Sequence, residues 1–204
     1  GKDFAVGVRI EHLQSEIGLA QYGGKFSLLP AEDYKLVSHA SERAAFTFCM
    51  CPGGYVMPAA SEEGGVVTNG MSDYARDGVN ANSALLVGVG PEDFGSEHPL
   101  AGMFLQRRIE QKAFVLGGQT GYAPCQTVGD LLAGHASGKL GCVQPSYKPG
   151  VVPCDLSELL PLPLIDAMRE AIPMLGRRLH GFDFPDAVLT GPETRSSSPV
   201  RIPR

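Results

Sequence analysis

The sequence predicts an α+β domain in which a mixed or antiparallel sheet, curled toward a barrel, shares one core with a small helical subdomain. In residues 1–95 and 186–204, short segments alternate apolar and polar side chains as strands do, whereas residues 96–185 follow a helical period. The 26 glycines and 16 prolines divide the chain at short intervals, which is typical of strands joined by turns. A length of 204 residues with 43% hydrophobic content suits a single domain.

The first expected strand covers residues 4–12, where Phe4, Val6, Val8 and Ile10 alternate with polar side chains. Arg9 and Glu11 fall on the opposite side, so this pattern predicts a strand with one face buried and one face exposed. Shorter segments with strand character are residues 34–37, 45–49, 55–57 and 66–69. The apolar run at 84–89 suits a central strand, and residues 186–190 return to strand character.

The helices are expected in the second half of the chain. Residues 99–114 form an amphipathic pattern, with Pro99 in the first turn and Gly117 and Gly118 ending the helix. A short helix is expected at 127–135 and a longer one at 162–179. Pro173 should kink or interrupt the longer helix, because proline supplies no amide hydrogen.

Composition excludes several classes of function. A formal charge of −5 with 17 basic residues provides no general attraction to nucleic acid or to anionic membranes. No apolar run is long enough to cross a bilayer. The cysteines are odd in number and irregularly spaced, which indicates a reducing compartment and therefore a cytoplasmic location. They are Cys49, Cys51, Cys125, Cys142 and Cys154.

Chemistry is concentrated in residues 46–83, FTFCMCPGGYVMPAASEEGGVVTNGMSDYARDGVNANS. Cys49 and Cys51 are the candidate catalytic residues. Gly53 and Gly54 follow them, and the backbone amides of a glycine turn would favour a thiolate at Cys51. The alternative is that both cysteines are small buried hydrophobic residues beside a turn.

A second group of candidates faces a substrate or cofactor. The segment Asn69-Gly70-Met71-Ser72 can bind a polar ring edge through backbone and side-chain groups, although Asn-Gly alone favours a tight turn. Arg76, Asn80 and Asn82 follow, and the two asparagines fit either a ligand shell or a loop that caps its own backbone.

Near the end of the chain, Arg195, Ser197 and Arg201 combine guanidinium and hydroxyl groups that can hold a phosphate or a carboxylate. The alternative is a solvated hydrophilic tail. Arg195 is the first choice for a contact with substrate or cofactor.

Two further possibilities receive less support from the residues. Glu11 and His12 could relay protons, but adjacent side chains on a strand point to opposite faces, which favours a surface location. The cysteines and histidines lack the paired spacing of a zinc site, so no metal is expected.

Several motifs resemble, in the same order, those of the uncharacterised FAD-dependent dehydrogenases, a bacterial branch of the two-dinucleotide-binding flavoproteins. They are FAVGVRIEH, YGG, DYK, FCMCPGG, NGMS, ARDG, NANSA, PSYKPG and ETRSSSPVRI. The chain contains no G-x-G-x-x-G motif, begins at Gly1 and stops at Arg204, so it looks like a domain excised from the middle of a longer flavoprotein.

The resemblance implies a function for residues 1–204 as a whole. They would form the substrate-side domain of an FAD-dependent oxidoreductase, closing over a flavin held by other segments of the full-length chain. FAD would belong to the full-length protein, and the fragment alone would neither retain it nor be active. The remaining partner would be a small-molecule substrate, and a role for NAD(P) stays open. The alternatives are a non-catalytic binding or assembly module and a cysteine-nucleophile hydrolase.

Overall fold

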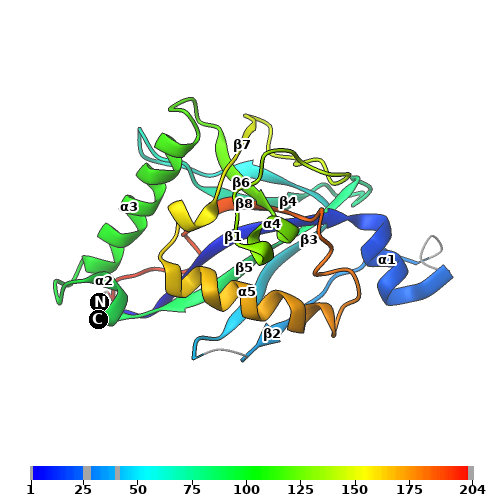
Figure 1. Cartoon of the computed structure of the whole chain (residues 1–204), viewed down its shortest axis with the longest axis horizontal. Helices are drawn as coiled ribbons and strands as arrows, with labels where there is room; N and C mark the ends of the chain where they lie inside the picture. Colours follow the sequence, from blue (N-terminus) through cyan, green and yellow to red (C-terminus); the bar gives the residue numbers. More distant parts are fainter. Residues whose placement is uncertain (1, 25–28, 40–41, 202–204) are drawn as a thin grey trace.

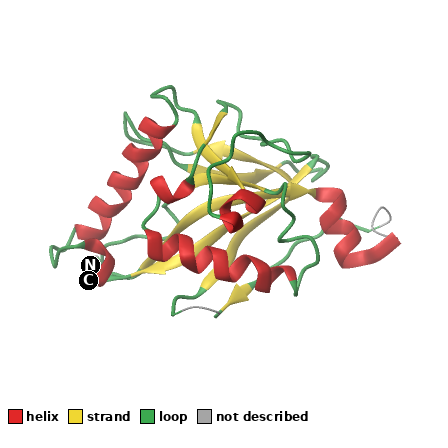
Figure 2. Cartoon of the chain, in the orientation of Figure 1, coloured by secondary structure: helices red, strands yellow, loops and turns green. Residues whose placement is uncertain are grey.

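Eight strands form one open, mixed sheet in the computed structural model, which describes residues 2–24, 29–39 and 42–201 (Figures 1 and 2). The strand order is β2-β3-β5-β1-β8-β6-β7, with β4 paired to β3 outside this path. The strands are β1 (Phe4–Leu13), β2 (Val37–Ser38), β3 (Ala45–Pro58), β4 (Thr68–Ser72), β5 (Asn80–Val89), β6 (Ala123–Thr127), β7 (Val151–Pro153) and β8 (Val188–Glu193). Only β6 and β7 pair in parallel among these strands, and the α+β class is confirmed.

The helices are α1 (Gln14–Tyr22), α2 (Pro91–Phe94), α3 (Ala101–Leu116), α4 (Val128–Ala133), the 3-10 helix η2 (Leu156–Glu158) and α5 (Leu162–Gly176). Figure 2 shows α4 and α5 in front of the sheet. Three predicted helices are present, and α3 ends at Gly117 as expected. Of the two outcomes expected at Pro173, a kink or an interruption, the interruption is wrong, because α5 continues through it to Gly176.

The main core lies between the sheet and α5. Val6, Val8 and Ile10 of β1 are fully buried, together with Ile165 and Met168 of α5. Burying one such side chain stabilises a fold by about 1.5–3 kcal/mol, so this apolar layer holds α5 on the sheet. The apolar face of residues 4–12 was therefore predicted correctly.

The opposite face of β1 is also buried, and the prediction of a half-exposed strand is wrong. The exposed fractions of Arg9 and Glu11 are both 0%. The physical reason is a second layer formed by segments from elsewhere in the chain. Thr68 of β4 donates a hydrogen bond to the carbonyl of Pro192 (3.0 Å), and Ser146 N–H donates to Glu11 (3.1 Å).

That second layer begins with a bend in β3. The first part of β3 pairs with β5 and its end pairs with β4, with register shifts between Phe48 and Gly54. Cys49 and Gly53 both have a φ of 49° at this bend. A Cβ at Gly53 would lie 1.9 Å from the carbonyl oxygen of Arg76, so only glycine fits there. The bend folds β4 back against β1, β5 and β8, and the sheet curls without closing into a barrel.

Several strand boundaries differ from the prediction. Residues 45–49 and 55–57 belong to the single strand β3, and only Val37–Ser38 of the region around 34–37 is strand. Residues 80–83 belong to β5, so Asn80 and Asn82 are in a strand and not in a loop. The helix α1 was not predicted, and residues 96–185 also contain β6 and β7.

The two ends of the described chain lie side by side (Figure 1). Lys2 N–H donates a hydrogen bond to the carbonyl of Pro199 at 3.1 Å. Among the helices that the structure describes, none combines the length and the apolar character needed to span a membrane.

Candidate functional site

Three of the predicted motif segments meet at the side chain of Arg9. Its Nη1 donates to the carbonyl oxygen of Cys49 (2.8 Å) and to Oδ1 of Asn82 (3.2 Å), and its Nη2 donates to Oδ1 of Asn69 (3.1 Å). Glu193 accepts two further hydrogen bonds from Nε and Nη2, at 2.7 and 3.2 Å. We call Arg9, Cys49, Asn69, Asn82 and Glu193 the Arg9 cluster.

The cluster is held by a buried, bidentate ion pair. Burial raises the pKa of the Glu193 carboxyl, and the adjacent Arg9 guanidinium opposes that shift. A paired and fully hydrogen-bonded charge is costly to disturb, because either group left alone would lose both hydration and partner. Arg9 therefore holds the backbone carbonyl of Cys49 and the side-chain amide of Asn69.

The tight turn predicted from the Asn69-Gly70 pair is wrong, and the surroundings of Gly70 explain why. Asn69 and Gly70 lie inside β4, opposite Met57 and Val56 of β3. A Cβ at Gly70 would lie 2.5 Å from Nη1 of Arg9 and from Oδ1 of Asn82. Glycine is needed here for close approach of the strand to the buried guanidinium and not for a turn conformation.

Exposed side chains adjoin the cluster on the outside of β3 and β4. Cys49 and Asn69 are exposed, and next to them along the chain Phe48 is 47% and Met71 is 45% exposed. Contiguous exposed apolar surface marks contact sites, whereas single exposed apolar side chains are common on any protein. We call Phe48, Cys49, Asn69 and Met71 the β3–β4 patch.

The two candidate thiols have different surroundings, so the alternative in which both are buried is wrong for Cys49. Cys51 is buried, and its Sγ donates to the carbonyl of Cys49 at 3.3 Å. Burial raises the pKa of Cys51, which disfavours a thiolate. The expected help from the glycine amides is missing for a specific reason: Gly53 N–H already donates to Oε1 of Gln14 at 2.5 Å.

A cavity of about 820 Å³ lies beside the bend of β3. Gly53, Gly54 and Asn80 line it, as three of the predicted site residues. Ser146 and Lys148 of the PSYKPG motif complete its wall. Further lining residues are Leu13, Tyr55, Asp73, Asp77, Gly78, Val79, Cys142, Gln144, Pro145 and Tyr147. We call this space the Gly53 cavity.

Glu11 lies directly behind the Gly53 cavity, and its predicted surface location is wrong. It accepts hydrogen bonds from Ser146 Oγ (2.6 Å), Ser146 N–H (3.1 Å) and Asn80 Nδ2 (2.9 Å). Burial raises the pKa of Glu11, and these hydrogen bonds oppose the shift. A carboxylate with a perturbed pKa behind a cavity is a frequent feature of functional sites.

His12 is also buried, and it does not join Glu11. Its Nε2 lies 2.8 Å from the carbonyl oxygen of Phe182, to which it donates. Burial lowers the pKa of His12 to about 4. Its Nδ1 has no hydrogen-bond partner among the described residues. The proton relay between Glu11 and His12 that the sequence left open is therefore not formed.

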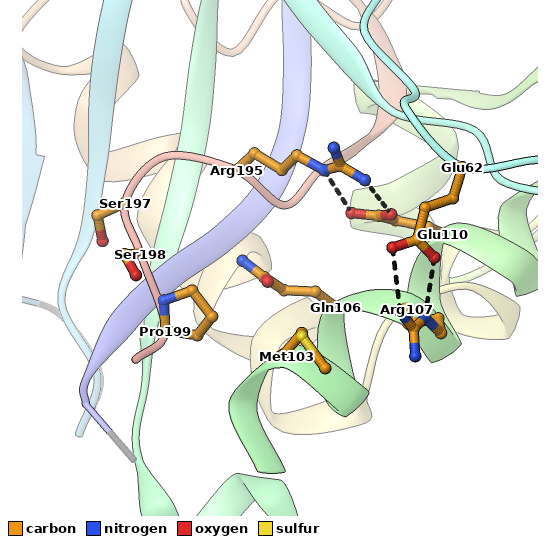
Figure 3. A pocket seen from close by; sticks show the side chains of 9 residues that line it. All are labelled: Glu62, Met103, Gln106, Arg107, Glu110, Arg195, Ser197, Ser198 and Pro199. Carbon is orange, nitrogen blue, oxygen red and sulfur yellow. Dashed lines mark hydrogen bonds and ion pairs between the residues drawn. The ribbon is translucent and has the colours of Figure 1, made fainter. Parts of the chain in front are cut away.

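Arg195 lines a different pocket, of about 390 Å³ (Figure 3). Its Nη2 lies 2.8 Å from Oε2 of Glu110, and this hydrogen bond raises the pKa of Arg195. Figure 3 shows Arg195 turned toward Glu110, with Ser197 on the other side of the pocket. The Arg195 guanidinium is thus paired with a carboxylate of the domain itself. Glu193 of the Arg9 cluster and Arg195 are two residues apart along the chain, but no member of the cluster lines this pocket.

The remaining predicted residues lie outside these groups. Arg76 is exposed with a φ of 52° and lines a separate cavity of about 510 Å³ with Gln14 and Glu32. Ser72 donates to the carbonyl of Pro52 at 2.8 Å, and Arg201 is exposed. Within residues 2–24, 29–39 and 42–201, no group of three His, Cys, Asp or Glu side chains could hold a metal.

Sequence reasoning missed Arg9, Glu193 and Ser146 as parts of the site. One signal was present for Arg9, which stands between Val8 and Ile10 in the most apolar part of its strand. A charge in such a run needs a buried partner, but the partner, Glu193, comes from the other end of the chain.

Comparison with known proteins shows the family to which this chain belongs. The chain belongs to the family described as FAD-dependent protein, C-terminal domain-like, which matches residues 3–196. An uncharacterized protein of Clostridium beijerinckii is 50% identical to it over 207 residues. The alignment covers 100% of this chain and 39% of that relative, so the chain spans well under half of the longer protein's length.

Proposed function

We propose that this domain is the substrate-side part of an FAD-dependent oxidoreductase of the dehydrogenase type, and that its β3–β4 patch closes over the flavin. Other segments of the full-length protein would bind FAD, which supplies the hydride or electron transfer. The role of this domain is to position the substrate, to orient it toward the flavin and to exclude water from the reacting atoms.

The observation that carries the proposal is the convergence of three motif segments on Arg9. Cys49, Asn69 and Asn82 come from β3, β4 and β5, and one buried guanidinium binds all three. A contact surface for a cofactor must be held in a fixed geometry by buried groups behind it. The Arg9 cluster supplies that support, while Phe48 and Met71 remain exposed above it.

FAD binding separates the domain from the full-length protein. The sequence lacks the glycine-rich motif that binds a dinucleotide phosphate, so the 204-residue chain should show no stoichiometric binding in an FAD titration. The full-length protein should retain one FAD per chain. Tight FAD binding by the 204-residue chain would contradict the proposal.

A pair of matched variants of the full-length protein tests which face meets the flavin. Met71→Ala should shift the visible absorbance of bound FAD, because Met71 is 45% exposed on the proposed contact surface. Leu162→Ala is the control: this side chain is 59% exposed, but it begins α5 on the other side of the sheet. An unchanged spectrum with Met71→Ala, or an equal shift with Leu162→Ala, would contradict the proposed orientation. Failure of every substrate to reduce the bound FAD would favour a non-catalytic module.

A further inference from the structure

The Gly53 cavity has a polar floor whose hydrogen-bond capacity can be counted. The floor consists of Asn80 and Ser146, with the carboxylate of Glu11 behind them. Each group has a fixed number of donors and acceptors. The hydrogen bonds already made within the domain therefore determine what the floor can still offer to a ligand.

Both amide protons of Asn80 are in use. Its Nδ2 donates to Oε2 of Glu11 (2.9 Å) and to the carbonyl oxygen of Gln144 (2.8 Å). Both partners are acceptors, so they fix the orientation of the amide. Among the described residues, no hydrogen bond is made to Oδ1 of Asn80, which leaves an acceptor beside the cavity.

The hydroxyl proton of Ser146 is also already used in a hydrogen bond within the domain. Its hydroxyl donates to Oε2 of Glu11 at 2.6 Å and accepts from the N–H of Val56 at 2.8 Å. Because the N–H of Val56 already donates to this hydroxyl oxygen, the single hydroxyl proton is directed toward Glu11. One lone pair of Ser146 Oγ remains for a ligand.

The charged side chains at the rim of the cavity favour a ligand that donates hydrogen bonds or carries positive charge. Asp73 and Asp77 are exposed carboxylates, and Lys148 is the exposed ammonium group of the lining. Two negative charges and one positive charge leave the rim net negative. Apolar surface of the wall comes from Leu13, Val79, Pro145 and the rings of Tyr55 and Tyr147.

We propose that the Gly53 cavity binds a small ligand through a hydrogen-bond donor group, an alcohol or a protonated amine, with Asn80 Oδ1 and Ser146 Oγ as the acceptors. Glu11 is the positioning residue, because it directs the protons of both groups away from the ligand. Alcohols and amines are also groups that a flavin can oxidise by accepting a hydride. The role of the cavity as a substrate site rests on the proposed function, whereas its preference for donors rests on the floor alone.

Three probes that share one ring test this preference: benzylamine, benzyl alcohol and benzoate. Each is titrated into the ¹⁵N-labelled 204-residue chain, and the backbone amide shifts of residues 53–54, 78–80 and 146–148 are followed. Benzylamine and benzyl alcohol should bind with affinities on the order of millimolar, as expected for such small molecules. Benzoate should bind at least about tenfold more weakly, because its carboxylate meets the acceptors of the floor and a rim with net negative charge.

Two variants test the contributions of the floor and of the rim to binding separately. Glu11→Gln turns one amide N–H toward the floor, which should reduce the preference of the cavity for benzylamine over benzoate. Asp73→Asn combined with Asp77→Asn changes only exposed groups, so it tests the rim even if Glu11→Gln does not fold. This double variant should weaken benzylamine several-fold and leave benzyl alcohol unchanged.

Benzoate binding as tightly as benzylamine, or no shift of the cavity amides with any probe, would overturn the proposal. These titrations contain no FAD. A failure of the proposed flavin contact would therefore leave the probe binding intact, and loss of probe binding would leave the flavin spectra of the full-length variants intact.

Discussion

A buried guanidinium loses its hydration, and fixed acceptors must replace the lost water. Arg9 has these acceptors on every side: a bidentate carboxylate from Glu193, two amide oxygens and the carbonyl of Cys49. Such an arrangement adds little net stability compared with apolar side chains of the same shape, but it is very sensitive to the loss of one partner. The stability of the domain should therefore depend on both members of the pair together.

Removing Arg9 alone should be strongly destabilising. Arg9→Met leaves the Glu193 carboxylate buried without a counter-charge, which should lower the free energy of unfolding by about 3–5 kcal/mol. The double variant Arg9→Met with Glu193→Met should recover most of that loss, because no unpaired charge remains. Urea denaturation of both variants and the parent measures this. Losses that simply add in the double variant would show that the pair does not act as a unit.

At the scale of elements, His12 joins the end of β1 to the segment after α5 through its bond to Phe182. The imidazole is completely buried, and burial lowers its pKa from 6.5 to about 4. Below the unfolded pKa, the unfolded chain takes up a proton that the folded chain does not. Folding is then disfavoured progressively as the pH falls.

This linkage predicts acid sensitivity with a definite sign. As the pH falls from 6.5 to about 4, the domain should lose up to about 3 kcal/mol of stability through His12. His12→Phe should remove the part of the pH dependence of stability that comes from His12, and leave the part that comes from the acidic groups. Urea denaturation at pH 7, 6, 5 and 4 compares the two proteins. Parallel pH curves would show that His12 titrates normally in the folded domain.

The elements themselves were largely predictable where the pattern was strong. The stripe of Leu164, Ile165 and Met168 predicted α5, and the helix continues through Pro173 to Gly176 although proline supplies no backbone N–H there. The helix α1 was not predicted because it buries only Ile17 and Gly18, and Leu19 is 50% exposed. A segment with so small a buried face has no clear period in the sequence.

The sequence motifs indicated which segments of the chain hold the candidate site residues, but not which side chains contact one another. The motifs around Cys49, Asn69 and Asn80 correctly marked the residues that gather at the bend of β3. Their hydrogen-bond partners, Arg9 and Glu11, were expected on the exposed face of a half-buried strand. Their burial depends on β4 and on residues near Ser146, and local alternation carries no information about such distant segments.

At the scale of the whole molecule, β1 lies in the middle of one continuous sheet. It pairs with β5 along its full length and with β8 from the far end of the sequence. One large cluster of buried apolar side chains includes residues of the sheet, α3 and α5. The strand-rich and helix-rich parts of the sequence thus share a core, which favours a single cooperative unit.

We therefore expect the 204 residues to unfold in one transition. Far-ultraviolet circular dichroism and tyrosine fluorescence should report the same denaturation midpoint, and the chain has 6 tyrosines and no tryptophan. Two separated midpoints would contradict a single cooperative unit.

The pairing of the first strand with the last also dictates when folding can finish. Arg9 and Glu193 are separated by 184 positions, so at about 5–20 residues per second a ribosome adds the acid some ten to forty seconds after the base. Throughout that interval one edge of the nascent β1 is unpaired and its guanidinium stays in water. The centre of this sheet is therefore among the last parts of the domain to be completed during synthesis, although β1 is the first of its described strands along the chain.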